Sequence, residues 1–243
     1  MAGRIAAHHG KPPAASVIAI VPAAGAGRRS GTSSKALRTL RGVPVLAHVL
    51  QRLSAVAAIR SIIVVVRRSE RSRVRQLIAR YRLRKVEQVV LGGPTRMASV
   101  RCGLAAADAR AAYLLIHDAA RPLIAPRVIT RAIRAARQQG AAIVAMPATD
   151  TIKVQRHGAR PGRLTTLPRH TVWIAQTPQV FRSALIRRAY AAAAQAGVTV
   201  TDDAAAVERL RHRVAIVPSD AANLKITWPT DFAVAETLLN GHR

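Results

Sequence analysis

Short apolar runs alternate along this chain with longer stretches in which apolar residues recur at helical spacing. The runs predict strands at residues 17–21, 61–66, 86–91, 113–117, 141–146 and 214–217. The helical patterns cover residues 45–57, 70–82, 97–107, 126–139, 183–194 and 202–210. Such alternation is typical of βαβ units. The strands lack polar alternation, as strands buried on both faces do. We therefore predict an α/β, Rossmann-like fold of nucleotidyltransferase type, with a mostly parallel sheet and helices on both faces.

One segment, at about residues 150–170, departs from this alternation of strand and helix patterns. It reads "DTIKVQRHGARPGRLTTLPRH", with a Thr/Ile/Val strand, a Gly/Pro turn and a second short strand. Because it is too polar and basic for a core, we expect an exposed β-hairpin arm. Such an arm covers a site or contacts a neighbouring subunit. We expect residues 1–16 to form a tail and residues 17–243 a single domain, because this length suits one α/β domain.

The composition limits the remaining classes. The single cysteine, Cys102, excludes an internal disulfide and a cysteine metal cluster, and its apolar helical surroundings favour a packed thiol. No apolar run reaches the ~18 residues of a membrane span, so no membrane partner is expected. The first run is interrupted by Pro22 and continues into "GRRSG", which favours a buried strand over a cleaved leader. We predict a cytoplasmic protein.

The charge is strongly positive, with 39 Lys and Arg against 11 Asp and Glu, a formal net charge of +28. Such a field attracts polyanions and anionic substrates. Many of the cations recur at helical spacing, as in "RAIRAARQQ", which is typical of solvated helix faces. Aromatic residues make up only 3% of the chain and offer few platforms for base stacking. Solvated faces are the simpler interpretation, and nonspecific nucleic-acid binding stays open.

The candidate chemistry follows the predicted strands, where open parallel sheets bind their ligands. The first strand leads into "PAAGAGRRSGTSSK", whose small residues let backbone N–H groups face an anion. Arg29 and Lys35 can then contact phosphate. The pattern is neither a Walker loop nor the dinucleotide fingerprint, and a tight turn alone would also need glycine. This loop predicts an anion site without naming the ligand.

Two later strands end in similar loops. In "GGPTRMASVRCGL", Gly92 permits close approach of a ligand, and Arg96 and Ser99 lie on the next helix, although an ordinary capped helix fits equally well. In "IHDAARPLI", Asp118 can hold Mg²⁺ or a hydroxyl, whereas a lone His117 is interpreted as structural. In "VTVTDDAAAVE", Thr201 or Asp202 has the position of a helix cap.

Taken in order, these motifs resemble one family. They are "PAAGxGxR", a lysine eight residues after its second glycine, "GGxxRxxSVxxGL", "HDAARP", "DTIK", "TPQxF", "TDDAxxVE" and "NxKIT". The set is similar to that of the 2-C-methyl-D-erythritol 4-phosphate cytidylyltransferases of the non-mevalonate isoprenoid pathway, from residue 17 to about residue 239. The loop departs from the family pattern, which usually has proline where Ser34 precedes Lys35.

The resemblance implies transfer of CMP from CTP to the phosphate of methylerythritol phosphate, with Mg²⁺ and release of pyrophosphate. An anionic phosphate needs no general base, so catalysis requires cations around the reacting phosphates. The implied catalytic residues are Arg29, Lys35, Arg169 and Lys225. The implied CTP-binding residues are Pro22, Ala23, Ala24, Gly25, Gly27, Gly92, Arg96 and Ser99. The implied acceptor-binding residues are Asp118, Arg121, Thr151, Arg169, Thr177 and Lys225, and the implied metal ligands are Asp118 and Asp202.

The resemblance also implies a homodimer in which the arm crosses to the partner subunit. Two alternatives stay open. One is a cytidylyltransferase for another polyol phosphate, such as ribitol 5-phosphate. The other is a basic nucleic-acid-binding protein on a degenerate transferase scaffold.

Overall fold

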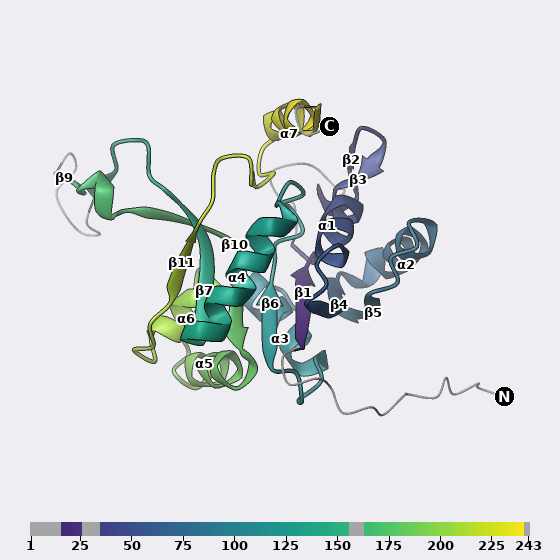
Figure 1. The fold of residues 1–243 in the computed structure, drawn as a ribbon, viewed down its shortest axis with the longest axis horizontal. Helices are drawn as coiled ribbons and strands as arrows, with labels where there is room; N and C mark the ends of the chain where they lie inside the picture. Colours follow the sequence, from purple (N-terminus) through teal and green to yellow (C-terminus); the bar gives the residue numbers. More distant parts are fainter. Residues whose placement is uncertain (1–15, 26–34, 156–162, 241–243) are drawn as a thin grey trace.

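The computed structural model describes residues 16–25, 35–155 and 163–240 and is built around a seven-stranded sheet (Figure 1). Across the sheet the order is β11-β7-β10-β6-β1-β4-β5. The strands are β1 (Val17–Pro22), β4 (Ile59–Val66), β5 (Val86–Leu91), β6 (Tyr113–Ile116), β7 (Ala141–Pro147), β10 (Trp173–Arg182) and β11 (Ala215–Pro218). Every neighbouring pair is parallel except the two that include β10. The mostly parallel α/β sheet confirms the predicted fold class.

Helices cover both faces of this sheet (Figure 1). One face carries α1 (Val45–Ser54), α2 (Arg71–Arg80) and α4 (Pro126–Gln139), and the other carries α3 (Arg96–Ala106), α5 (Ser183–Gln195) and α6 (Asp203–Glu208). Alternate residues of β1 point to opposite faces, so Ala19 packs in one apolar cluster and Ile20 in the other. Both faces are buried, which explains why the strands show no polar alternation.

A third apolar cluster joins the small hairpin β2 (Thr39–Leu40) and β3 (Val43–Pro44) to α7 (Thr230–Asn240). Leu40 is fully buried there with Phe232, and the guanidinium of Arg38 lies 3.9 Å from the centre of the Phe232 ring. The final helix therefore packs beside the segment that follows Lys35, at one end of the sheet (Figure 1). Three single-turn 3₁₀ helices complete the described chain: η1 (Lys35–Leu37), η2 (Arg68–Glu70) and η3 (Arg169–Thr171).

The predicted strands and helices are confirmed to within three residues at each end, but β10, α7 and the short strands β2 and β3 were not predicted. Within β10, Pro178 lacks the N–H that a strand needs, which obscured the pattern. The pairing with β7 shifts register between Ala175 and Gln179, so the residues between them leave the regular ladder. Thr177 lies within this irregular stretch, and its Oγ accepts the N–H of Asp118 in the loop that follows β6.

The arm is a hairpin of β8 (Lys153–Gln155) and β9 (Leu164–Thr166), as predicted. Its strands pair antiparallel, every residue in them is exposed, and the hairpin projects from the body of the molecule (Figure 1). Several large apolar side chains of the arm and its base are also exposed: Val154, Leu164, Trp173 and Ile174.

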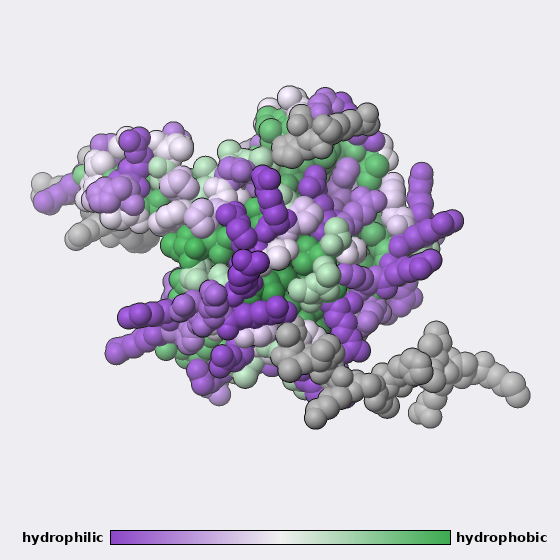
Figure 2. All heavy atoms as spheres, viewed as in Figure 1, coloured by the Kyte–Doolittle hydropathy of each residue, from purple (hydrophilic) through white to green (hydrophobic). Residues whose placement is uncertain are grey.

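Many of the basic residues lie on solvated helix faces, as the helical spacing predicts. Figure 2 shows hydrophilic side chains extending from the body of the molecule, with apolar residues between them. On α4, Ile129 and Ile133 are buried, and the exposed side carries Arg127, Arg131 and Arg134. Within the described ranges, no helix combines the length and apolar character that crossing a membrane requires.

Candidate active site

The loops that follow β1 and β5 lie against each other at the carboxyl end of β4. The N–H of Ala23 donates to the carbonyl of Val65 (2.7 Å), and the N–H of Gly92 donates to the carbonyl of Val66 (2.9 Å). A Cβ on Gly92 would lie 2.6 Å from the Cβ of Ala24 and 2.7 Å from the Oγ of Ser99. Only glycine therefore allows the two loops to approach this closely.

Ser99 and Thr95 stabilise the start of α3. The Oγ of Thr95 accepts the N–H of Ala98 (3.0 Å) as an N-cap, and the hydroxyl of Ser99 donates to the carbonyl of Thr95 (2.9 Å). Ser99 is buried, so its visible role is to support the loop around Gly92. Pro22 ends β1, and Gly25 is exposed with open space around it. Gly27 and Arg29 lie outside the described residues.

Asp118, in the loop that follows β6, accepts bonds from two cations that are distant in sequence. Its Oδ1 lies 3.0 Å from the Nε of Arg96, and its Oδ2 lies 2.7 Å from the Nζ of Lys225. Burial alone would raise the pKa of Asp118, but the charges of Arg96, Lys225 and Arg121 hold that pKa well below its usual range. The carboxylate is thus ionised and fixes both cations at the edge of the sheet.

The other end of the Arg96 guanidinium binds Asp203, the first residue of α6. Its terminal nitrogens lie 3.1 and 2.7 Å from the two carboxylate oxygens of Asp203, and the hydroxyl of Tyr190 donates to the same carboxylate. Burial lowers the pKa of Arg96, but the charges of Asp203 and Asp118 raise it above its usual value. The sequence interpretation missed Asp203 and Tyr190, although the paired aspartates of "TDDA" were a signal. Asp202 caps α6 through the N–H of Ala205 (2.9 Å), as predicted.

His117 belongs to a buried chain of hydrogen bonds, in agreement with its structural interpretation. The N–H of Asp118 donates to the Oγ of Thr177 (3.0 Å), which lies 3.1 Å from the Nδ1 of His117. Since the carbonyl of Arg121 only accepts, the Nε2 of His117 donates to it (3.1 Å), and Nδ1 accepts from Thr177. Burial lowers the pKa of His117 to about 4, so the ring is neutral at neutral pH.

The segment "NLKIT" runs beside the loop after β6. Arg121 donates to the carbonyl of Asn223 (2.7 Å), and the N–H of Ile226 donates to the carbonyl of Ala120 (2.8 Å). The Nζ of Lys35 donates to the carbonyl of Thr227. Lys35, Arg121 and Lys225 are therefore brought to the same end of the sheet from three distant parts of the chain.

Two predicted site residues of the arm are not part of this network in the described chain. Thr151 is exposed at the base of the arm. Arg169 begins η3 and donates to the carbonyl of Thr149 (2.9 Å), which ties the two sides of the arm together.

The predicted metal ligands do not fit a shared Mg²⁺ site in this arrangement. Asp118 binds Arg96 and Lys225, while the second oxygen of Asp202 accepts from the Nε2 of Gln179 (2.9 Å). Across the described residues, no cluster of three His, Cys, Asp or Glu side chains could hold a metal ion. The carboxylates of Asp118 and Asp202 are instead occupied by Arg96, Lys225, Gln179 and the N-terminus of α6.

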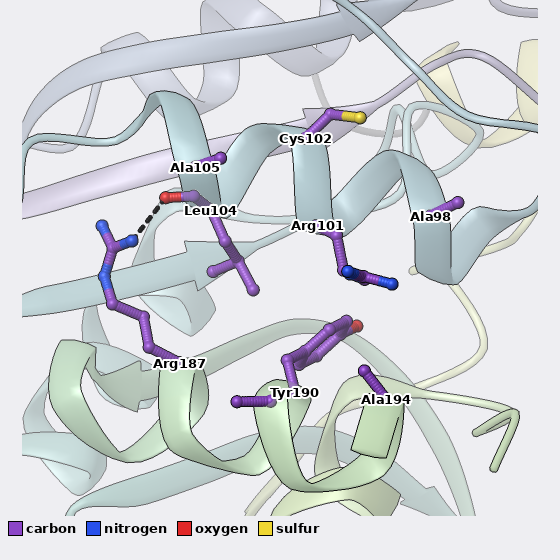
Figure 3. Close-up of a pocket in the computed structure, with 9 residues that line it drawn as sticks. Ala98, Arg101, Cys102, Leu104, Ala105, Arg187, Tyr190 and Ala194 are labelled. Carbon is purple, nitrogen blue, oxygen red and sulfur yellow. Dashed lines mark hydrogen bonds between the residues drawn. The ribbon is translucent and has the colours of Figure 1, made fainter. Parts of the chain in front are cut away.

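A separate pocket lies between α3 and α5 (Figure 3). Cys102 lines it and is half-buried, so the predicted packed thiol is only partly enclosed. Arg187 donates to the carbonyl of Leu104 (2.6 Å), near the end of α3, and Tyr190 lies between the two helices. This pocket borders the Tyr190 that contacts Asp203.

The fold and this site define an α/β nucleotidyltransferase, with a close-packed small-residue loop after β1 and cations gathered around a buried aspartate. The family model of 2-C-methyl-D-erythritol 4-phosphate cytidylyltransferase matches residues 17–241, and the chain belongs to this family. The family predicted from the motifs is thereby confirmed.

Individual relatives align with this chain over nearly their whole length. The 2-C-methyl-D-erythritol 4-phosphate cytidylyltransferase of Acidobacterium capsulatum is 44% identical over 227 residues, covering 90% of this chain and 95% of that protein. The protein of the same name from Syntrophus aciditrophicus is 42% identical and covers 92% and 95%. The crystal structure of 4-diphosphocytidyl-2C-methyl-D-erythritol synthase from Anaerococcus prevotii has a TM-score of 0.82 at 28% identity, covering 93% and 97%.

Proposed function

We propose that this protein transfers CMP from CTP to the phosphate of 2-C-methyl-D-erythritol 4-phosphate, giving 4-diphosphocytidyl-2-C-methyl-D-erythritol and pyrophosphate. The observation that carries this proposal is the family match over residues 17–241. An acceptor phosphate oxygen forms the new bond to the α-phosphorus of CTP, and the bond from that phosphorus to the bridging oxygen of pyrophosphate breaks. No proton needs to leave the nucleophile, because a phosphate monoester is already ionised at neutral pH.

The cations of the site supply what this reaction needs, because negative charge must be stabilised on the α-phosphate and on the departing pyrophosphate. In this proposal Arg29 and Lys35 bind the triphosphate. Lys35 is held at the carbonyl of Thr227, which orients its ammonium group. The proposed frame of the cytidine consists of Pro22, Ala23, Ala24, Gly25, Gly27, Gly92, Arg96 and Ser99.

Lys225 and Arg121 would bind the acceptor phosphate, with Thr177 and Asp118 beside them. Arg121 supports this assignment because it is buried, and its Nε has no hydrogen-bond partner among the described residues. A buried unpaired N–H is costly, and an anionic ligand would satisfy it. Mg²⁺ enters the proposal as a companion of the triphosphate, because Mg²⁺ sites commonly combine few carboxylates with substrate phosphates.

The proposal includes a cytoplasmic homodimer in which Thr151 and Arg169 of the arm reach the partner's site. The exposed apolar side chains of the arm support it, because Leu164 is 53% and Ile174 is 44% exposed in the single chain.

Replacing Leu164 and Ile174 with glutamate should give a monomer in light scattering and lower the turnover. Arg169→Ala should raise the KM for the acceptor and leave CTP affinity intact. A dimer unaffected by the double substitution would contradict the role of the arm.

Pyrophosphate release tests the reaction directly. Purified protein would receive CTP, Mg²⁺ and methylerythritol phosphate, with UTP and ribitol 5-phosphate as parallel substitutes. Release only with the first pair supports the proposal. Faster release with ribitol 5-phosphate would favour the other polyol phosphate, and no release from folded protein with any pair would contradict a cytidylyltransferase.

A further inference from the structure

The guanidinium of Arg96 is fixed on two sides by carboxylates from different parts of the fold. Its Nε donates to Asp118, and its two terminal nitrogens donate to Asp203. These bonds use three of the five N–H groups of an arginine. The Arg96 side chain keeps 29% of its surface exposed, whereas that of Asp203 keeps 0%. The buried carboxylate therefore sets the plane of the guanidinium, while part of the cation still faces solvent.

Tyr190 supports Asp203 from behind. It lies on α5, is 3% exposed, and donates its hydroxyl to the oxygen of Asp203 that also accepts from Arg96. Burial, and then the adjacent charge of Asp203, raises the pKa of Tyr190 above its usual value, so the hydroxyl keeps its proton and stays a donor. Tyr190 and Asp203 thus form a fixed support for Arg96. Neither residue belongs to the loops that follow β1, β5 and β6.

The charges explain why a second carboxylate is needed. Asp118 faces Arg96, Lys225 and Arg121. Without Asp203, one aspartate would have to balance three cations, and Arg96 would compete with Lys225 for Asp118. With Asp203 present, Arg96 is held at its far end and Asp118 remains available to fix Lys225. The support thus separates a cation of the proposed CTP site from a cation of the proposed acceptor site.

We propose that Asp203 and Tyr190 are positioning residues that orient Arg96 for CTP binding. This inference rests on the proposed function, in which Arg96 frames the cytidine. Neither residue needs to touch a substrate, because both act through the guanidinium of Arg96. A purely structural pair would instead hold α6 against α3, and its loss would affect folding without affecting CTP.

Tyr190→Phe is the sharpest test, since it removes one hydroxyl and keeps the ring. We expect the KM for CTP to rise about fivefold, with kcat at saturating CTP within about twofold of wild type, which is the sign of lost ground-state binding. Tyr113→Phe is the matched control, because its hydroxyl makes only a long bond of 3.5 Å to the carbonyl of Arg137. The control should leave both constants unchanged.

Asp203→Asn tests the charge itself and should weaken CTP binding about 50-fold, as measured by titration calorimetry on protein shown to be folded. If that variant does not fold, Arg96→Lys combined with Tyr190→Phe replaces it. Because lysine cannot bind a carboxylate bidentately, the tyrosine substitution should have almost no further effect on CTP affinity in the Arg96→Lys background.

The outcomes separate the two proposals. If Tyr190→Phe lowers the melting temperature but leaves the CTP affinity of the folded protein unchanged, the positioning role is wrong. Additive effects of Arg96→Lys and Tyr190→Phe would also overturn it. Wild-type protein that binds CTP but releases no pyrophosphate would contradict the proposed reaction alone. The CTP affinities of wild type and Tyr190→Phe, measured by calorimetry, would still test the positioning role. Wild-type protein that binds no CTP would overturn both.

Discussion

Thr177 is the residue through which the strand β10 stabilises the loop after β6. Its Oγ accepts the N–H of Asp118 and donates to the Nδ1 of His117, and all three residues are buried. Thr177→Val keeps the shape of the side chain but leaves both partners unsatisfied. We expect urea denaturation to show a loss of about 2–4 kcal/mol in unfolding free energy, from two unpaired buried groups. Thr177→Ser keeps the hydroxyl and should lose only about 1 kcal/mol for the missing methyl group. Equal losses in the two variants would contradict the hydrogen-bonded chain.

The pKa of His117 gives the protein a stability that depends on pH. Burial lowers this pKa to about 4 in the folded state, whereas the unfolded value is about 6.5. The folded state therefore resists protonation of His117. The neutral His117 contributes its full stabilisation of the folded state above pH ~6.5, and this stabilisation is lost as the pH falls toward 4. The unfolding free energy should fall by up to about 1.4 kcal/mol per pH unit in this range. Chemical denaturation of His117→Gln should show a shallower slope there. Equal slopes for wild type and variant would contradict a neutral buried His117.

At the scale of the elements, α3 lies close to the sheet because of one glycine. A Cβ on Gly103 would lie 2.4 Å from the Cγ2 of Ile20 and 3.2 Å from the Cγ2 of Val65. Alanine improves helix propensity by about 1 kcal/mol, but overpacking costs about 1–3 kcal/mol. Both strand residues are buried and cannot move away, so Gly103→Ala should be destabilising overall.

A thermal or urea comparison with Ile20→Ala provides the control for this contact. In the double variant the new methyl group occupies space vacated by Ile20, so the combined loss should be smaller than the sum of the two single losses. Because α3 carries Arg96 at its first residue, Gly103→Ala should also raise the KM for CTP. Strictly additive losses in unfolding free energy would show that the contact between Gly103 and Ile20 does not limit how closely α3 packs on the sheet.

For the whole molecule, the net charge of +28 predicts an affinity for polyanions that is separate from catalysis. The sequence of α4 contains no acidic residue, so its exposed arginines have no acidic partner within the helix. We expect weak binding to a random RNA duplex that falls steeply with salt. Arg127→Gln with Arg134→Gln should reduce the slope of log K against log salt by about 2 and leave CTP turnover unchanged. If no binding occurs even at low salt, these arginines serve only to solvate the helix.

The sequence by itself determined the alternation of strands and helices, the hairpin arm, the family motifs and the position of the loops that are candidates for anion binding. These features depend on local periodicity, on glycine and proline, and on residues that are close together in the chain. They place Lys35, Arg96, Asp118 and Lys225 among the candidates because each follows or belongs to a recognisable motif. The carboxyl ends of parallel strands meet at one edge, so the general location of the site was also predictable.

Only the tertiary structure decided how these candidates are paired. The position of β10 between β6 and β7 depends on long-range pairing, and its break at Pro178 conceals the strand in the sequence. The contact from Arg96 to Asp203 spans 107 positions, and its support by Tyr190 requires α5 and α6 to pack together. The local capping pattern marks Asp202 as the start of a helix, but nothing local shows that Asp203 is a partner of Arg96. The buried carboxylate becomes a partner of Arg96, and the other becomes a helix cap, because the fold turns their side chains toward different surroundings.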